Sequence, residues 1–355
     1  MIEYFAEYGL FLAKSATVLI VVLFIVAAIG NLAIRQRRSG EHGRIEARRL
    51  NHSIEDMRDA LRGELLDAKA LGKLRKTEAK ETKRQQKQQQ KQQQKADSEA
   101  RKRRVWVLDF DGDMQASAVA ALRNEVTAVL TMAEQGDEVV ARIESPGGMV
   151  HGYGLAASQL HRIRAREGVA LTVAVDMVAA SGGYLMACIG EKILAAPFAV
   201  VGSIGVVAQV PNVHRLLKRH DVDVEILTAG EYKRTLTVFG ENTDKGRQKF
   251  IEELEDVHTM FKDFVHENRP ALEIDKVATG EAWHGRRALE VGLVDELMTS
   301  DEYLVKACTD ADVIEVRWVE QRSPVERLIQ QSTARLGEAV ERVLTRWRDR
   351  STWTG

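Results

Sequence analysis

The stretch Asp176-Met-Val-Ala-Ala-Ser-Gly-Gly-Tyr184 places a serine among residues with very small side chains. Two alanines precede Ser181 and two glycines follow it. The apolar run at 170–175 leads into this stretch and predicts a buried strand, and residues 184–189 predict the start of a buried helix. A serine at such a turn is open to attack a substrate, and the amides at the start of a helix stabilise negative charge. We therefore predict that Ser181 is a catalytic nucleophile.

The sequence on both sides of Ser181 alternates between predicted strands and predicted helices. This alternation favours an α/β fold whose parallel strands are joined by right-handed crossovers. The predicted strands are residues 105–110, 139–143, 170–175, 192–196, 224–228 and 313–318, and the predicted helices are 117–132, 150–166, 213–220, 246–268, 281–290 and 301–308.

The motif Ser145-Pro-Gly-Gly148 follows the second predicted strand and opens the helix that comes next. Two glycines let a backbone come close to a ligand and point its amides at it. The motif alone is equally compatible with an ordinary strand-to-helix turn. Because Ser181 follows the next strand at the same edge of a parallel sheet, we predict that the N–H groups of Gly148 and Gly182 form an oxyanion hole.

A seryl nucleophile also needs a general base, and two kinds of residue are candidates. The histidines, of which His151 is nearest to the glycine motif, lie in no pattern that pairs them with an acidic residue. Lys233 follows the predicted strand 224–228, and a lysine can act as a base when burial lowers its pKa. The residues alone leave open that Lys233 is a surface lysine. The sequence GxSxG is absent, which argues against an α/β-hydrolase.

A second glycine-bearing loop, Gly202-Ser-Ile-Gly-Val-Val207, begins 21 residues after Ser181. It is compatible with a tight turn between strands, or with an edge to which an extended peptide adds as a strand. We predict that the substrate contacts lie here and beside the first glycine motif, at Gly147, Met149, Ser203, Ile204 and Gly205.

The N-terminal part of the chain predicts a membrane anchor. Residues 16–34 are nearly all apolar, and nineteen residues in a helix span about 28 Å, close to the thickness of the bilayer's hydrocarbon core. Including the extension at 10–13, we predict an N-terminal segment at 1–9 and a single uncleaved transmembrane helix at 10–34. The six arginines between 35 and 49 place the following domain in the cytoplasm by the positive-inside rule.

The charge of the chain is unevenly distributed. The formal net charge is −1, but Lys73 to Arg104 carry a net +9 and the remaining residues a net −10. Residues 35–104, with their Lys/Gln-rich tract, predict a helical spacer that contacts the lipid bilayer or only solvent. Nucleic acid is not an expected partner, because no aromatic residues interleave the basic ones. Residues 105–320 predict the globular domain, and 321–355 an amphipathic C-terminal helix.

The two cysteines, Cys188 and Cys308, show no CxxC spacing and no metal-ligand pattern, so we predict neither a metal site nor a cofactor.

Five motifs in this order resemble the membrane-anchored Ser-Lys peptidases of the signal peptide peptidase A type. They are SPGG at 145–148, DxVAASGGY at 176–184, GSIGV at 202–206, GEYKRT at 230–235 and TGExWxGxxAxxxGLVD at 279–295. The resemblance implies a ClpP/crotonase-like fold of repeated ββα units, with Ser181 as nucleophile and Lys233 as general base. It also implies peptide substrates and a homo-oligomeric ring or dome, in which some relatives complete the dyad across subunits.

The resemblance implies a bacterial inner-membrane protein whose catalytic domain faces the periplasm, whereas the arginines after the anchor indicate the cytoplasm.

Two other functions are compatible with the residues. One is an acyl-CoA enzyme on the same fold, which uses the paired amides without a covalent serine. The other is a non-catalytic membrane scaffold.

Overall fold

The computed structural model describes residues 43–67, 70, 76, 80 and 101–320. One compact unit, Ile45–Arg317, contains every site discussed below. The predicted segments 1–9, 10–34 and 321–355, and nearly all of the Lys/Gln tract, lie outside the described residues. Within the described ranges, no helix has the length and apolar character needed to cross a bilayer.

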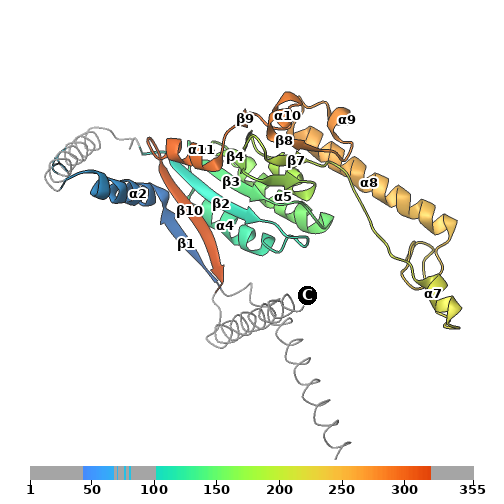
Figure 1. Ribbon diagram of the computed structural model, residues 1–355. Coiled ribbons are helices and arrows are strands. Elements are labelled where there is room, and N and C mark those ends of the chain that lie inside the picture. The colour runs from blue at the N-terminus through green and yellow to red at the C-terminus, as the bar shows by residue number, and fades with distance from the viewer. Residues whose placement is uncertain (1–42, 68–69, 71–75, 77–79, 81–100, 321–355) are drawn as a thin grey trace, which may run out of the picture. The chain divides into compact units, whose positions relative to one another are not determined.

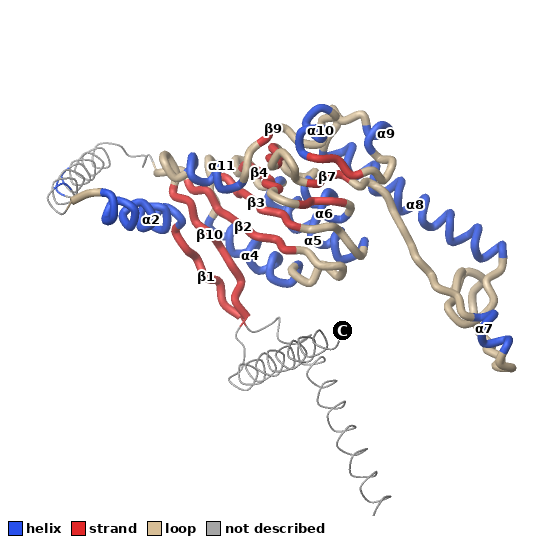
Figure 2. Tube along the Cα trace, viewed as in Figure 1, coloured by secondary structure: helices blue, strands red, loops and turns tan. Residues whose placement is uncertain are grey.

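Seven of the described strands form the main sheet (Figures 1 and 2). Every neighbouring pair from β10 to β9 is parallel, which confirms the predicted α/β class with a parallel sheet. In spatial order the strands are β1 (Gly43–Arg49), β10 (Asp312–Glu320), β2 (Arg104–Asp111), β3 (Glu138–Glu144), β4 (Ala170–Val175), β6 (Lys192–Ala195) and β9 (Glu296–Leu297).

The central strands are buried on both faces, which explains why they are continuous apolar runs in the sequence. Side chains alternate between the two faces of a strand. Leu108 and Phe110 belong to the core shared with helices α4 (Val119–Met132) and α5 (Val150–Arg164). Val105 and Val107 belong to the core shared with α11 (Ser300–Ala307).

A second, three-stranded sheet carries the Ser181 stretch. Its order is β5 (Val178–Ala180), β7 (Val200–Gly202) and β8 (Ala282–His284), with β5 and β7 parallel and β8 antiparallel. The chain passes from β4 to β5 at Asp176, whose carboxylate accepts hydrogen bonds from the amide and hydroxyl of Ser300 at 2.8 and 2.5 Å. The strand directly before Ser181 is therefore β5, and the predicted strand 170–175 is one strand further back.

The short helices α6 (Gly182–Ala187), α9 (Ile274–Val277) and α10 (Gly285–Glu290) complete this region. The prediction of one helix over 281–290 is wrong for its first residues. Ala282 to His284 pair with β7, and only from Gly285 onward does the chain turn into α10. The partner strand β7 lies 80 residues earlier at Gly202, and such a distant pairing leaves no pattern in the local sequence of β8. The prediction therefore followed the helical pattern of the residues that form α10.

Between β7 and α8 (Asp244–Asn268) lies a long excursion that contains α7 (His214–Arg219), and we call residues 207–243 the arm. Figure 1 shows α7 near the start of α8, at the opposite end from α9. The predicted strand at 224–228 is wrong, because all five residues are exposed and form no strand. An apolar run becomes a strand only where a neighbouring strand takes up its backbone hydrogen bonds.

The predicted helical spacer 35–104 contains a strand, β1, as well as helix α2 (Leu50–Leu65). The side chain of Asn51 in α2 donates to the carbonyls of Cys308 and Ala311 at 3.2 and 3.0 Å and accepts from the Val313 amide at 2.8 Å. The beginning of the predicted spacer is thus tied to the globular domain.

Candidate active site

Ser181 lies at the turn between β5 and α6 and has an unusual backbone conformation. Its φ and ψ are 52° and −118°, in a region that side-chain-bearing residues rarely occupy. The Ser181 amide donates to the Gly202 carbonyl at 2.7 Å, and the Leu185 amide donates to the Ser181 carbonyl at 2.9 Å. Such strained residues persist only where the surrounding structure holds them, and they cluster at functional sites. The side chain of this serine is half-buried, so it remains accessible.

The SPGG motif lies directly beside this turn, as the parallel sheet predicted. The Ser145 amide donates to the Val178 carbonyl at 2.8 Å, and the Ala180 amide donates to the Ser145 carbonyl at 3.0 Å. Gly147 has a φ of +89°, and a Cβ placed on it would lie 2.7 Å from the Gly182 nitrogen and 2.8 Å from the Ser181 Cβ. The backbones of the two glycine turns therefore touch, and only glycine fits at the point of contact.

The amides of the SPGG turn have different partners. Gly147 N–H donates to Ser145 Oγ at 3.0 Å, and Met149 N–H donates to the Met114 carbonyl at 2.8 Å. No hydrogen bond among the described residues occupies Gly148 N–H, and Gly148 is half-buried. Gly182 is the first residue of α6, where an N–H has no partner within the helix. Among the described residues, the two predicted oxyanion donors, Gly148 and Gly182, thus have no acceptor, and they lie on adjoining turns.

The GSIGV loop adjoins Ser181 from the other side, because Gly202 accepts the Ser181 amide. Ser203 has a φ of 52°, and its amide donates to the Glu281 carbonyl at 2.7 Å. The Ile204 carbonyl accepts from Gly280 N–H at 3.1 Å, and the Ile204 side chain is buried. The predicted contact residues Ser203, Ile204 and Gly205 therefore directly follow the residue that accepts the Ser181 amide, although residues 280 and 281 already occupy part of this loop's edge.

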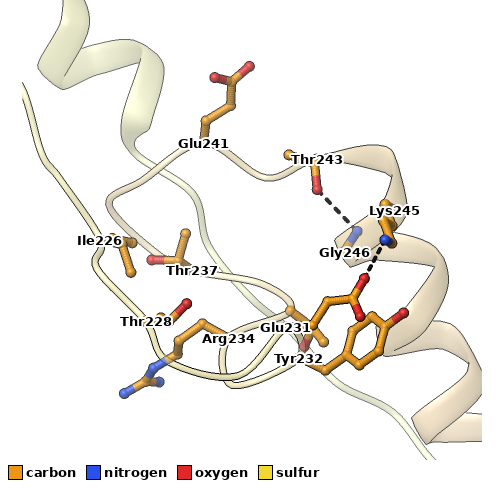
Figure 3. Close-up of a pocket in the computed structure, with 11 residues that line it drawn as sticks. Ile226, Thr228, Glu231, Tyr232, Arg234, Thr237, Glu241, Thr243, Lys245 and Gly246 are labelled. Carbon is orange, nitrogen blue, oxygen red and sulfur yellow. Dashed lines mark hydrogen bonds and ion pairs between the residues drawn. The ribbon is translucent and has the colours of Figure 1, made fainter.

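Lys233 lies in the arm, and the structure does not bring it to Ser181 within one chain. Its side chain is exposed, and its amide donates to the Gly230 carbonyl at 3.2 Å. The arm packs on the first turn of α8, where Glu231 forms an ion pair with Lys245 at 2.5 Å. Figure 3 shows the Glu231–Lys245 ion pair among the residues that line a hollow. The hollow has a volume of about 220 Å³, and its lining includes Tyr232, Arg234 and Thr235.

Helix α8 separates the arm from the sheets. Its first buried residue is Phe261, followed by Val265, whereas the arm meets α8 at Lys245 and Gly246. Phe261 follows Gly246 by fifteen positions along the helix, a rise of about 22 Å. The expected position of Lys233 just past a buried strand is therefore wrong, because the preceding residues are exposed and the arm is held at the far end of a long helix.

Among the described histidines, none forms a hydrogen bond with Ser181. His151 is exposed on α5, and His284 is exposed with its Nδ1 3.3 Å from the Phe198 carbonyl oxygen. His258 is half-buried in α8.

One residue of this region was not predicted from the sequence. Tyr153, on α5, is fully buried, and its hydroxyl lies 2.5 Å from Ser145 Oγ. A possible signal was its position between Gly152 and Gly154, eight residues after the serine of the SPGG motif. A lone tyrosine in a helix more often belongs to the core, so this signal is weak.

Comparisons with known proteins identify the family. Residues 3–160 match the model of the peptidase family S49 N-terminal region, and residues 163–314 match that of peptidase family S49. The chain is similar to the probable protease SohB of Haemophilus influenzae, with 48% identity over 327 residues that cover 92% of each chain. It is also 48% identical over 242 residues to the probable protease SohB of Buchnera aphidicola from Acyrthosiphon pisum, covering 68% of this chain and 72% of that relative. The chain therefore belongs to peptidase family S49.

Proposed function

We propose that this peptidase is a serine endopeptidase in which Ser181 is the nucleophile and Lys233 the general base. The observation that carries the proposal is the contact between two turns. Ser181, strained at a φ of 52°, directly adjoins a glycine turn whose Gly148 amide has no acceptor among the described residues. This is the arrangement that a seryl nucleophile and an oxyanion hole require.

In the proposed reaction, the neutral amine of Lys233 takes the proton of the Ser181 hydroxyl as Oγ attacks the carbonyl carbon of a peptide bond. The carbonyl oxygen becomes negatively charged, and the N–H groups of Gly148 and Gly182 stabilise it. The lysine ammonium then gives its proton to the leaving amine, the C–N bond breaks, and an acyl-enzyme remains. The amine next takes a proton from water, whose hydroxide attacks the acyl carbon. The ammonium then returns a proton to Ser181 Oγ as the ester C–O bond breaks, which releases the acid product and restores the neutral lysine.

We propose that Lys233 reaches Ser181 of a neighbouring copy in a ring or dome of subunits. Within one chain Lys233 is exposed, and a lysine base requires a desolvated environment, so a second surface has to cover it. The arm exposes large apolar residues that a neighbouring subunit would bury, among them Val207 at 92% and Leu227 at 90% exposure. This distribution is typical of a surface that associates with another protein.

The proposed substrates are extended, apolar peptides such as residual signal peptides or fragments of membrane proteins. The side chains of Met114 and Met149, next to Gly148, are 67% and 44% exposed and offer adaptable apolar contacts.

The S49 membership supports the ClpP/crotonase-like arrangement of ββα units, of which β4, β5 and α6 are one. We also propose a single-pass anchor at residues 10–34 in the bacterial inner membrane. Protease accessibility in intact spheroplasts distinguishes a periplasmic from a cytoplasmic domain.

Complementation between inactive variants tests both the dyad and its sharing. We expect Ser181→Ala and Lys233→Ala to abolish peptide cleavage separately, and the mixed proteins to regain activity, since one copy then supplies a serine and its neighbour a lysine. Lys218→Ala is the control, because Lys218 is another exposed lysine of the arm. Activity that survives in both single variants refutes the dyad, and inactivity of the mixture refutes the sharing.

A fluorophosphonate probe distinguishes the serine peptidase from the other two functions. We expect the probe to modify Ser181 in active protein, with no modification of the Ser181→Ala variant. Absence of this modification while the protein remains active would favour acyl-CoA chemistry without a covalent serine.

A further inference from the structure

A single buried tyrosine contacts both glycine turns of the candidate active site. We propose that Tyr153, acting through Ser145, is a positioning residue that aligns Gly148 and Gly182 as oxyanion donors. The inference rests on the proposed function, since it concerns the same serine chemistry. Tyr153 touches neither the substrate nor the reacting atoms and acts through the two turns.

The first link is a chain of hydrogen bonds. Tyr153 O–H donates to the Asp113 carbonyl at 2.7 Å, and Ser145 Oγ lies 2.5 Å from the same phenol oxygen. Gly147 N–H donates to Ser145 Oγ at 3.0 Å. The Ser145 hydroxyl also lies 3.3 Å from the Gly112 carbonyl, but the shorter 2.7 Å contact to Asp113 favours the phenol proton going there. With that proton directed at Asp113, Ser145 donates to the phenol and accepts from Gly147. The bonds run in one direction, so each polarises the next.

This chain determines which amide of the SPGG turn is free. Gly147 N–H points at Ser145 Oγ and is occupied, whereas Gly148 N–H has no acceptor among the described residues. Ser145 Oγ already lies within hydrogen-bond distance of the Gly112 carbonyl, at 3.3 Å, and without the phenol this carbonyl is the remaining acceptor for its proton. Ser145 Oγ, which accepts the hydrogen bond of Gly147 N–H, then shifts. The next peptide plane, which carries Gly148 N–H, loses the contact that fixes its orientation.

The second link is packing against the nucleophile turn. A Cβ placed on Gly182 would overlap the Tyr153 ring, with Cδ2 only 2.7 Å away. The ring therefore lies directly under the residue that follows Ser181. Phe110 holds the ring from another side in an edge-to-face contact with a centroid distance of 6.1 Å. The position of Gly182 N–H depends on the same side chain that orders the SPGG turn.

The hydroxyl remains a donor over the working pH range. Burial raises the pKa of Tyr153 above its ordinary value, although the hydrogen bond with Ser145 opposes the shift. The phenol stays protonated at neutral pH, and its bond to the Asp113 carbonyl persists.

The test compares two buried tyrosines in the full-length protein. Tyr153→Phe keeps the ring and removes the hydroxyl. Tyr184→Phe is the matched control. Tyr184 is equally buried and lies in the same helix as Gly182, but its hydroxyl donates to the Leu293 carbonyl at 2.9 Å and bonds neither glycine turn. For each variant the melting temperature, kcat and KM for a peptide, and the rate at which a fluorophosphonate acylates Ser181 are measured.

Loss of an oxyanion donor lowers kcat by about 10²–10³-fold, and a misaligned donor should cost less. We therefore expect Tyr153→Phe to reduce kcat and the acylation rate by roughly 10–100-fold with KM changed by less than about threefold. Ser145→Ala should give a similar loss, and the double variant should lose little more, because the two residues act in one chain. Tyr184→Phe should lower only the melting temperature.

Equal acylation rates for Tyr153→Phe and Tyr184→Phe would overturn the inference, as would a loss confined to the melting temperature. This failure is distinguishable from a failure of the proposed function. If the probe modifies Ser181 at the wild-type rate in Tyr153→Phe, the nucleophile stands and only the positioning role is refuted. If the probe leaves Ser181 unmodified in the active wild-type protein, the proposed function itself is refuted.

Discussion

Gly147 allows the contact between the two glycine turns to be tested with a single methyl group. In Gly147→Ala the new Cβ lies 2.7 Å from both the Ala180 oxygen and the Gly182 nitrogen, and 2.8 Å from the Ser181 Cβ. Ordinary contact begins at 3.4 Å, so the turns have to separate by about 0.7 Å. The neighbouring atoms are backbone and Cβ atoms, which cannot rotate away.

The expected loss of unfolding free energy in Gly147→Ala has two parts, backbone strain and steric collision. A φ of +89° costs a residue with a side chain about 1–2 kcal/mol, and the collision adds roughly 1–3 kcal/mol. The unfolding free energy should therefore fall by about 2–5 kcal/mol. A displacement of 1 Å at a reacting centre costs about 10²-fold in rate, so a separation of about 0.7 Å should lower kcat by roughly 10–100-fold.

Gly136 provides a control that separates these parts. Its φ is +88°, and a Cβ placed on it meets nothing within 4 Å. Gly136→Ala should therefore cost only the backbone strain, about 1–2 kcal/mol, with an unchanged rate of serine acylation. Denaturant unfolding measures the stability of both variants, and the rate of the fluorophosphonate reaction measures how reactive Ser181 remains. If Gly147→Ala matches Gly136→Ala in both measurements, the close approach of the turns is refuted.

Two further predictions concern stability and thiol reactivity. Burial alone would raise the pKa of Asp137, but hydrogen bonds from the Glu134 and Arg104 amides and from Arg101 outweigh it and hold that pKa below its ordinary value. The ionised carboxylate thus stabilises the fold above the unfolded pKa of about 4, and this contribution is lost as pH falls through the lower folded pKa. Asp137→Asn should lower the melting temperature at pH 7, with the difference from wild type shrinking below about pH 4; a constant difference would contradict this account. Burial raises the pKa of the Cys188 thiol to about 12, so iodoacetamide at pH 8 should modify Cys188 only after unfolding, and rapid modification of the native protein would contradict its burial.

The sequence predicted those strands that are buried on both faces. Residues 105–110, 139–143 and 170–175 were located within about two residues of β2, β3 and β4. A strand buried on both faces has to be apolar at every position, so it leaves a continuous run. Strand β1 was missed, because its sequence GRIEARR is mostly charged and exposed. Its pairing is with β10, more than 260 residues later, and no local pattern records such a partner.

For the site, the motif at Ser181 and the motif at 145–148 predicted two turns at one sheet edge, and the structure brings them into contact. The location of the lysine was not predictable in the same way. Residues 224–228 have the composition of a strand, yet they lie exposed in the arm. Composition reports only that a segment is able to pair, whereas pairing also requires a neighbouring strand with free hydrogen-bonding groups.

By itself, the sequence determined the parallel α/β class, the serine turn and the neighbouring glycine turn. These features depend on side-chain volume, hydrophobic periodicity and short spacings, all of which are local. Only the tertiary structure decided that Gly147 touches the Ser181 turn, that Tyr153 lies beneath Gly182, and that Lys233 is remote from the serine of its own chain. Each of these is a relation between segments far apart in the sequence, and it arises only when the core packs and brings those segments together.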